Sequence, residues 1–106
     1  MNRMSKTNII FDNKNAINQS FLYFLHEEDK FDEKAFSELY TYVSELDSIS
    51  LAELKDLYFI SNQIIRHIIY HFDGNDSTKI TDLPSEYWEY IDSIDKAINN
   101  IRSVVV

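Results

Sequence analysis

The stretch that decides the fold runs from Ser50 to Asp76 and reads SLAELKDLYFISNQIIRHIIYHFDGND. Ser50 and Glu53 have the spacing of a capping box, in which two side chains satisfy free backbone groups at the start of a helix. Apolar residues then recur with the helical period at Leu54, Leu57, Tyr58, Ile64, Ile65, Ile68, Ile69 and Phe72. The pattern predicts a long central helix over 50–72, covered by neighbours on more than one side and ended by Gly74.

Three further helices are predicted, two before this stretch and one after it. The first covers 15–28. The second covers 32–46, with Asp32 as its N-cap, because an aspartate side chain accepts hydrogen bonds from the first free N–H groups. The third covers 84–102, because Pro84 lacks only a hydrogen bond that the first helical turn does not make. Its core stripe is Tyr87, Ile91, Ile94, Ile98 and Ile101.

Length and composition support the same fold class. Gly and Pro occur once each in 106 residues, whereas a β-sandwich or barrel needs many turns built from them. A chain of this length can bury one hydrophobic core. We therefore expect an all-α fold, a compact bundle of about four main helices, with a polar N-terminal leader over 1–12 and a single helical domain over 13–106.

The chain has no cysteine and a formal net charge of −8. The lack of cysteine excludes disulfides, thiolate metal sites and Cys nucleophiles. Negative charge repels nucleic acids and anionic membranes and attracts basic proteins, although it also simply keeps a protein in solution. No run approaches the roughly 20 apolar residues of a membrane span, and no secretory signal pattern opens the chain. The expected location is cytoplasmic.

Two histidines in the long helix are candidate metal ligands. His67 and His71 lie four residues apart, so a helix turns both rings to one side, as in many Zn²⁺ sites. Asp73 is a carboxylate that could join them. A zinc protease would need Glu directly after the first histidine, where this chain has Ile68. The alternative is that both rings only hydrogen-bond to neighbours or water, and no cofactor is expected.

The connection after the long helix resembles an EF-hand calcium loop. The first, third and fifth loop positions hold Asp73, Asn75 and Ser77. The sixth position, which needs Gly, holds Thr78, and the twelfth, which needs a bidentate Glu, holds Pro84. Whether the segment from Asp73 to Glu86 binds an ion stays open at this point.

The sequence contains no catalytic motif, and the remaining class of function is binding to another protein through the surface. One glycine excludes a P-loop, a dinucleotide fingerprint and a G-x-S-x-G elbow, so we expect no enzyme. Acidic residues cluster at Glu27, Glu28 and Asp29 and again at Glu86, Glu89, Asp92 and Asp95. Trp88 and Tyr90 lie among the second group, and aromatic rings ringed by charge are typical of protein interfaces. These nine residues are the predicted partner-binding set; the alternative is a solvated helix face.

The segment HFDGND at 71–76, followed by Pro84 in a small, acidic, cysteine-free chain, resembles the immunity proteins of nuclease colicins. More widely, the chain is similar to bacterial immunity proteins of contact-dependent growth inhibition. The resemblance implies that the chain binds a cognate basic nuclease toxin domain, an RNase or a DNase, and covers its active site.

A second resemblance concerns SLAELKDLY at 50–58 and PSEYWEYI at 84–91. These segments are similar to parts of the Hha/YmoA nucleoid-associated modulators. This resemblance implies an alternative function, a regulatory module that binds another nucleoid-associated protein. A metal-binding module, EF-hand-like or histidine-based, is the third alternative.

Overall fold

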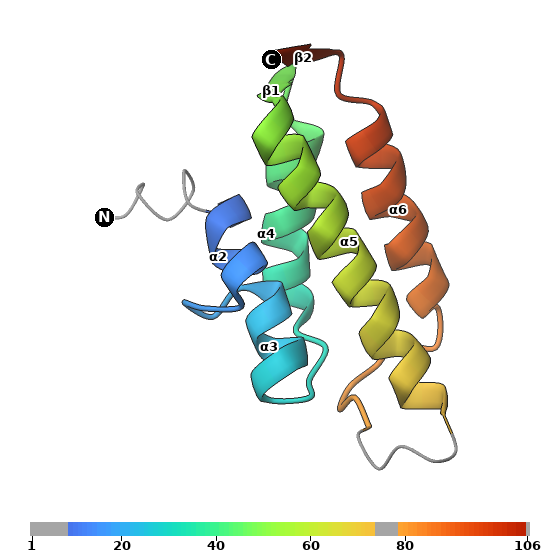
Figure 1. Ribbon diagram of the computed structural model, residues 1–106. Helices are drawn as coiled ribbons and strands as arrows, with labels where there is room; N and C mark the ends of the chain where they lie inside the picture. The colour runs from blue at the N-terminus through green and yellow to red at the C-terminus, as the bar shows by residue number, and fades with distance from the viewer. Residues whose placement is uncertain (1–8, 74–78, 106) are drawn as a thin grey trace.

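The computed structural model describes residues 9–73 and 79–105, which are mostly α-helical, as the sequence predicts. The elements in order are α2 (Ile9–Asn15), α3 (Phe21–Glu27), α4 (Glu33–Ser44), β1 (Ser48–Ser50), α5 (Leu51–Phe72), α6 (Tyr87–Asn99) and β2 (Ser103–Val105). In Figure 1, α5 crosses the middle of the bundle with α4 behind it, α2 and α3 on one side and α6 on the other. The expected all-α bundle is therefore confirmed.

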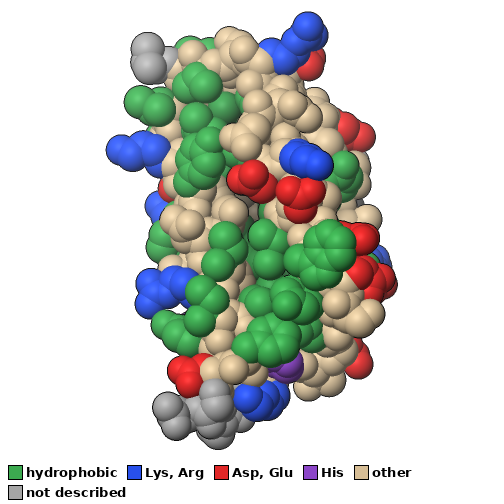
Figure 2. All heavy atoms as spheres, turned by 90° about the vertical axis from the view of Figure 1, so that its right-hand side faces the viewer, with side chains coloured by type: hydrophobic (Ala, Val, Ile, Leu, Met, Phe, Trp, Pro, Cys, Tyr) green, Lys and Arg blue, Asp and Glu red, His purple; other side chains and the backbone are tan. Residues whose placement is uncertain are grey.

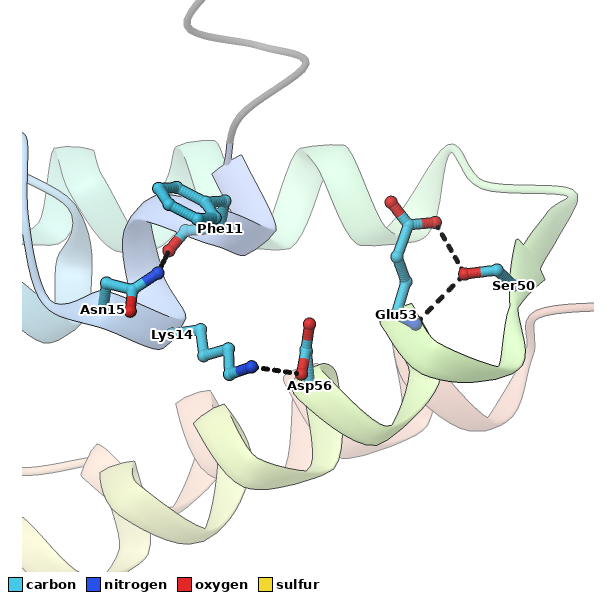
Figure 3. A network of polar contacts seen from close by, with 6 residues as sticks. All are labelled: Phe11, Lys14, Asn15, Ser50, Glu53 and Asp56. Carbon is cyan, nitrogen blue, oxygen red and sulfur yellow. Dashed lines mark hydrogen bonds and ion pairs between the residues drawn. The ribbon is translucent and has the colours of Figure 1, made fainter.

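The start of α5 confirms the N-cap bond of the predicted capping box, whereas the Glu53 side chain accepts from the Ser50 hydroxyl and not from the Ser50 backbone N–H that the full motif uses. The Glu53 backbone N–H donates to Ser50 Oγ at 3.1 Å, and the Ser50 hydroxyl donates to Glu53 Oε1 at 3.3 Å (Figure 3). Close by, Lys14 of α2 forms an ion pair with Asp56 of α5 at 3.1 Å. The first two turns of α5 are thus held by the cap at Ser50 and by the ion pair between Asp56 and α2.

The core lies along the side of α5 that faces the other helices. From α5 it contains Leu57, Ile60, Ile64 and Ile68; from α4, Ala35, Phe36, Leu39 and Val43; and from α6, Ile94, Ala97 and Ile98. Phe21 of α3 is fully buried and packs edge-on against the rings of Phe31 and Phe36, with ring centroids 5.0 Å and 5.2 Å apart. Asp32 caps α4 as predicted, because its Oδ1 accepts from the Ala35 N–H at 2.9 Å.

The single helix predicted over 15–28 is wrong, because the chain forms two short helices joined by a turn at 16–20. The segment DNKNAINQS at 12–20 offers side-chain partners that compete with helical backbone bonds. Asn13 Oδ1 accepts from the Leu22 N–H at 3.0 Å, and Ser20 Oγ caps α3 by accepting from the Tyr23 N–H at 3.3 Å. Residues 9–12, placed by the sequence in a polar leader, belong to α2, where Ile10 is buried. Residues 1–8 lie outside the described residues.

The two strands are a feature that the sequence pattern did not predict. β1 and β2 pair in parallel, with Ile49 opposite Val104. The helix predicted over 84–102 is shorter at both ends, since α6 begins at Tyr87 and ends at Asn99. The residues after α6 extend to reach β1, so the pairing joins the end of the chain to the start of α5.

The connection before α6 is held by backbone bonds to the loop between α3 and α4. The Phe31 N–H donates to the Thr81 carbonyl at 2.9 Å, and the Thr81 N–H donates to the Asp29 carbonyl at 2.6 Å. These bonds bring two loops that are distant in sequence to one end of the bundle. Among the described residues, no helix has the length and apolar character needed to cross a membrane.

Removal of the α5 cap tests the role of Ser50. We expect Ser50→Ala to lower the free energy of unfolding by about 1 kcal/mol, because the Glu53 N–H loses its acceptor. Ser48→Ala is the control, since Ser48 is exposed two residues earlier and should change stability by less than about 0.5 kcal/mol. Urea unfolding followed by circular dichroism measures both. Equal losses in the two variants would contradict the capping role.

The turn at 16–20 provides a second test of stability. Gln19 has a positive φ of 59°, a conformation that disfavours residues with a Cβ atom. Gln19→Gly should therefore stabilise the fold by about 0.5–1 kcal/mol. The same change at Gln63, inside α5, should destabilise it by about 1 kcal/mol. Opposite signs in thermal or urea unfolding would support this account, and a destabilised Gln19→Gly variant would contradict it.

Candidate functional site

One flank of α5 carries large apolar side chains that the bundle does not cover. Tyr58, Ile65, Ile69 and Phe72 are between 37% and 58% exposed. At about 100° per residue, these four positions fall within an arc of about 60° on the helix. The Tyr58 hydroxyl donates to Asn99 Oδ1 of α6 at 3.4 Å, so this flank is the one beside α6.

Trp88 of α6 adds to the same exposed surface. It is 58% exposed, and at about 100° per residue it lies within about 20° of Asp95 and 40° of Asp92 around α6. Asp95 Oδ2 accepts from Asn99 Nδ2 at 3.4 Å, which places this side of α6 next to Tyr58. We call the surface formed by Tyr58, Ile65, Ile69, Phe72 and Trp88 the α5–α6 face.

Figure 2 looks onto the side of the molecule that carries α6, and hydrophobic side chains gather there in a broad patch over its lower half. Acidic side chains lie above the patch and along its edge. A contiguous apolar surface with a polar border is typical of protein interaction sites, because isolated proteins seldom leave such area in contact with water. The arrangement can bind an apolar surface of a partner and can orient cationic groups around it.

Tyr90, the second predicted aromatic anchor, lies on another side of α6. Its ring packs edge-on against Phe31 and Phe36, with centroids 5.1 Å and 5.0 Å apart. Its hydroxyl donates to Glu33 Oε2 of α4 at 3.2 Å, and burial together with this contact raises the pKa of Tyr90. Tyr90 therefore joins α6 to α4 and does not share a surface with Trp88.

The acidic residues of α6 divide between two surfaces. Asp92 and Asp95 border the α5–α6 face, and Lys96 forms an ion pair with Asp92 at 3.0 Å. Glu89 is turned by about 100° from Trp88 and, together with Asp92, lines a groove between α6 and the end of α4. Glu86 lies before the helix, where its Oε1 accepts from the Ser85 hydroxyl at 3.1 Å.

The predicted acidic group of α3 lies elsewhere on the molecule. Glu27 and Glu28 are exposed and Asp29 is half-buried at the end of α3. Figure 1 shows α3 and α6 on opposite sides of α5. Glu28 Oε2 accepts from the Tyr23 hydroxyl at 3.1 Å, and this contact raises the pKa of Tyr23. The nine predicted partner-binding residues therefore do not lie on one surface.

The sequence pattern placed Tyr58, Ile65, Ile69 and Phe72 in the core, and their exposure is a correction. The α5 side chains in the core occupy a narrower arc of the helix, centred on Leu57. Helix α6 covers one edge of the exposed flank, and among the described residues no further helix lies beyond α6 to cover the rest (Figure 1). One signal was present in the sequence. Tyr58, Ile65 and Phe72 recur every seven residues, a spacing that keeps a stripe on one face of a helix.

The two candidate histidine ligands point to different partners. His67 is half-buried and its ring lies edge-on to that of His26, with centroids 5.8 Å apart. His71 Nδ1 accepts from the Ile80 N–H at 2.9 Å and so holds the chain where it returns from the connection. The described residues contain no group of three or more His, Cys, Asp or Glu side chains placed to hold a metal ion.

Most of the calcium-loop resemblance falls on residues 74–78, which lie outside the described residues. Asp73, its first position, makes the C-cap of α5, with its N–H donating to the Tyr70 carbonyl at 3.2 Å. Ile80, its eighth position, is buried in the core.

Comparison of the chain with models of protein families, with curated proteins and with solved structures finds no match.

The environment of His67 makes a prediction about pH. Burial lowers the pKa of His67, the neighbouring His26 lowers it further, and Asp29 partly offsets both. The unfolded chain therefore takes up this proton at a higher pH, near the ordinary value of about 6.5. As pH falls from about 7 toward 5, the unfolded state binds more protons than the folded state, so stability contributed by neutral His67 is lost.

Two variants check this expectation. His67→Gln should show a smaller loss of stability between pH 7 and pH 5 than the unchanged protein, as measured by urea unfolding. His26→Gln should raise the pKa of His67 toward its ordinary value, as measured by NMR titration of the imidazole, because one like-charged neighbour is gone. A His67 pKa at or above about 6.5 in the unchanged protein would refute the assignment.

Proposed function

We propose that this chain is a protein-binding module whose α5–α6 face docks a cationic protein partner, and that its role is that of an immunity protein which neutralises a nuclease toxin domain. The observation that carries the proposal is the exposed α5–α6 face with its acidic border at Asp92 and Asp95. The proposal gives the chain a binding role and no catalytic one.

The apolar part of the face would provide most of the affinity. Large rings that are exposed in the free protein and buried in the complex release water and dominate binding energies in many interfaces. Trp88 and Phe72 are each 58% exposed and lie on neighbouring helices. Phe72 also packs against Tyr87 of α6, with ring centroids 5.2 Å apart, so it is held in position before a partner arrives. Such preorganisation lowers the entropic cost of binding.

The charge of the protein would select the class of partner. A net charge of −8 speeds the approach of a cationic protein and repels nucleic acid. Nuclease domains carry cationic groups that bind phosphates, and carboxylates can occupy the same groups in place of a nucleic acid. Asp95, with Asp92 beside it, borders the apolar patch and would face such groups, so binding would block access of the nuclease to its substrate.

The product of the gene directly upstream tests the partner, because an immunity gene lies directly after its toxin gene, and we expect that product to contain a nuclease domain. Mixing equimolar amounts should abolish nuclease activity and give a one-to-one complex by calorimetry. If the upstream product is not a nuclease, or if its activity is unchanged at one-to-one stoichiometry, the toxin assignment fails. Binding to a nucleoid-associated protein at the same face would instead support the regulatory alternative.

A matched pair of phenylalanines tests the surface. Phe72 is 58% exposed on the α5–α6 face, and Phe11 is 60% exposed on α2. We expect Phe72→Ala and Trp88→Ala each to raise the Kd by about 30-fold, corresponding to about 2 kcal/mol. Phe11→Ala should leave the Kd unchanged within about twofold, since an apolar side chain outside the interface contributes little. Equal effects at Phe72 and Phe11 would remove the α5–α6 face from the proposal.

A charge-reversal pair tests the acidic border. Asp92→Lys combined with Asp95→Lys should slow association about tenfold at low salt, because steering of the cationic partner is lost. Glu27→Lys combined with Glu28→Lys makes the same change in net charge on α3 and should slow it much less. Stopped-flow measurements at two salt concentrations give both rates, and similar slowing in both variants would show that only the total charge matters.

A further inference from the structure

A second feature of the molecule is a cavity between α2, the turn at 16–20 and α4, with a volume of about 340 Å³. It lies outside the α5–α6 face and shares no lining residue with it. Its volume is at the small end of the range of ligand pockets, about 300–1,000 Å³. The cavity therefore suits one small group better than a large ligand.

Asp12, in the wall of this cavity, is a carboxylate that the fold only partly satisfies. Its residue exposure is 9%, and its Oδ1 accepts from Asn18 Nδ2 at 3.1 Å. No other described residue donates to the side chain, so its Oδ2 has no protein partner in this part of the chain. A carboxylate removed from water normally gains two or more donors or a counter-ion, because its desolvation is costly. The missing donor at Asp12 points to a ligand that brings N–H groups.

The wall of the cavity formed by α4 is also negatively charged. Glu38 of α4 and Glu45, the C-cap of α4, line the cavity, and neither forms an ion pair within residues 9–73 and 79–105. None of the described lining residues is Lys or Arg. One of the two N–H groups of the Asn18 amide is used by Asp12, and the other potential donors of the lining belong to neutral side chains such as Gln19 and Thr41. The cavity thus combines three carboxylates with no cation from the described lining, which is a surplus of negative charge.

The geometry points to a guanidinium group on a short aliphatic stem as the ligand of this cavity. A guanidinium offers five N–H donors, no acceptor and a permanent positive charge, which matches the surplus. A metal ion fits less well, because the described residues place no three candidate ligands around one point. The guanidinium belongs either to a free small molecule or to an arginine side chain of a bound protein.

Agmatine and N-carbamoylputrescine test the ligand class, since they differ only by a guanidinium replaced with a neutral ureido group. In ¹⁵N NMR titrations we expect saturable shifts with agmatine at Asn18, Thr41 and their neighbours, and binding at least about tenfold weaker with N-carbamoylputrescine, because charge-assisted hydrogen bonds are lost. Absence of saturable shifts at the cavity, or equal binding of both compounds, overturns the proposal.

Protein variants test the residues. Glu38→Gln and Glu45→Gln change exposed side chains, so the fold should keep its melting temperature while agmatine binding weakens several-fold. Glu89→Gln makes the same chemical change outside the cavity and should have no effect on agmatine binding. Equal weakening by Glu89→Gln would show attraction to total charge only and would overturn the assigned site.

A third arm separates the two sources of the guanidinium. The probe is the blocked tripeptide acetyl-Gly-Arg-Gly-amide, which presents an arginine side chain within a peptide backbone. Binding at the cavity as tight as that of agmatine supports an arginine of a partner protein. Binding of agmatine without the tripeptide supports a free small molecule. Binding of neither overturns the proposal, whatever the outcome for the α5–α6 face.

Discussion

Burial of one side of α5 is the interaction on which the rest of the structure depends. Isolated helices of fewer than about 12–15 residues are marginal in water, and α2 and α3 have seven residues each. They are held because both pack against the 22-residue α5, and α6 packs against its other side. Leu57, Ile64 and Ile68 of α5 lie in the one core that all these helices share.

The same constraint explains why an apolar surface is left over. The apolar arc of α5 is wider than its neighbours cover, because, of the described helices, α6 alone lies along the flank that carries Tyr58 and Phe72 (Figure 1). Apolar side chains on this flank that the core does not bury do not stabilise the isolated protein, but a partner could bury them. The aspartates beside Trp88 restrict which partner that is, since they favour cationic surfaces.

The turn at 16–20 shows how polar side chains can shape both fold and site. Asn13 has both ends of its amide bonded, Oδ1 to the Leu22 N–H and Nδ2 to the Ile9 carbonyl. Asp12, its neighbour, is bonded at one oxygen. The first residue locks the angle between α2 and α3, and the second is left facing a cavity with unused capacity. The difference between Asn13 and Asp12 depends on where each side chain lies in the folded protein, and the sequence of two adjacent polar residues does not predict it.

The sequence by itself determined the long helix, its N-cap at Ser50, the cap at Asp32 and the helical class of the fold. These follow from local spacing, because the helical period and the cap bonds involve residues only three or four apart. The break at 16–20 was also local, but it required weighing several competing side-chain bonds against helix propensity.

Only the tertiary structure decided the pairing of β1 with β2, the packing of Tyr90 against Phe31 and Phe36, and the separation of the α3 and α6 carboxylates. It also decided that Tyr58, Ile65, Ile69 and Phe72 stay exposed. The physical reason is that apolar periodicity tells which side of a helix avoids water, whereas the number and position of the neighbouring helices decide how much of that side is covered.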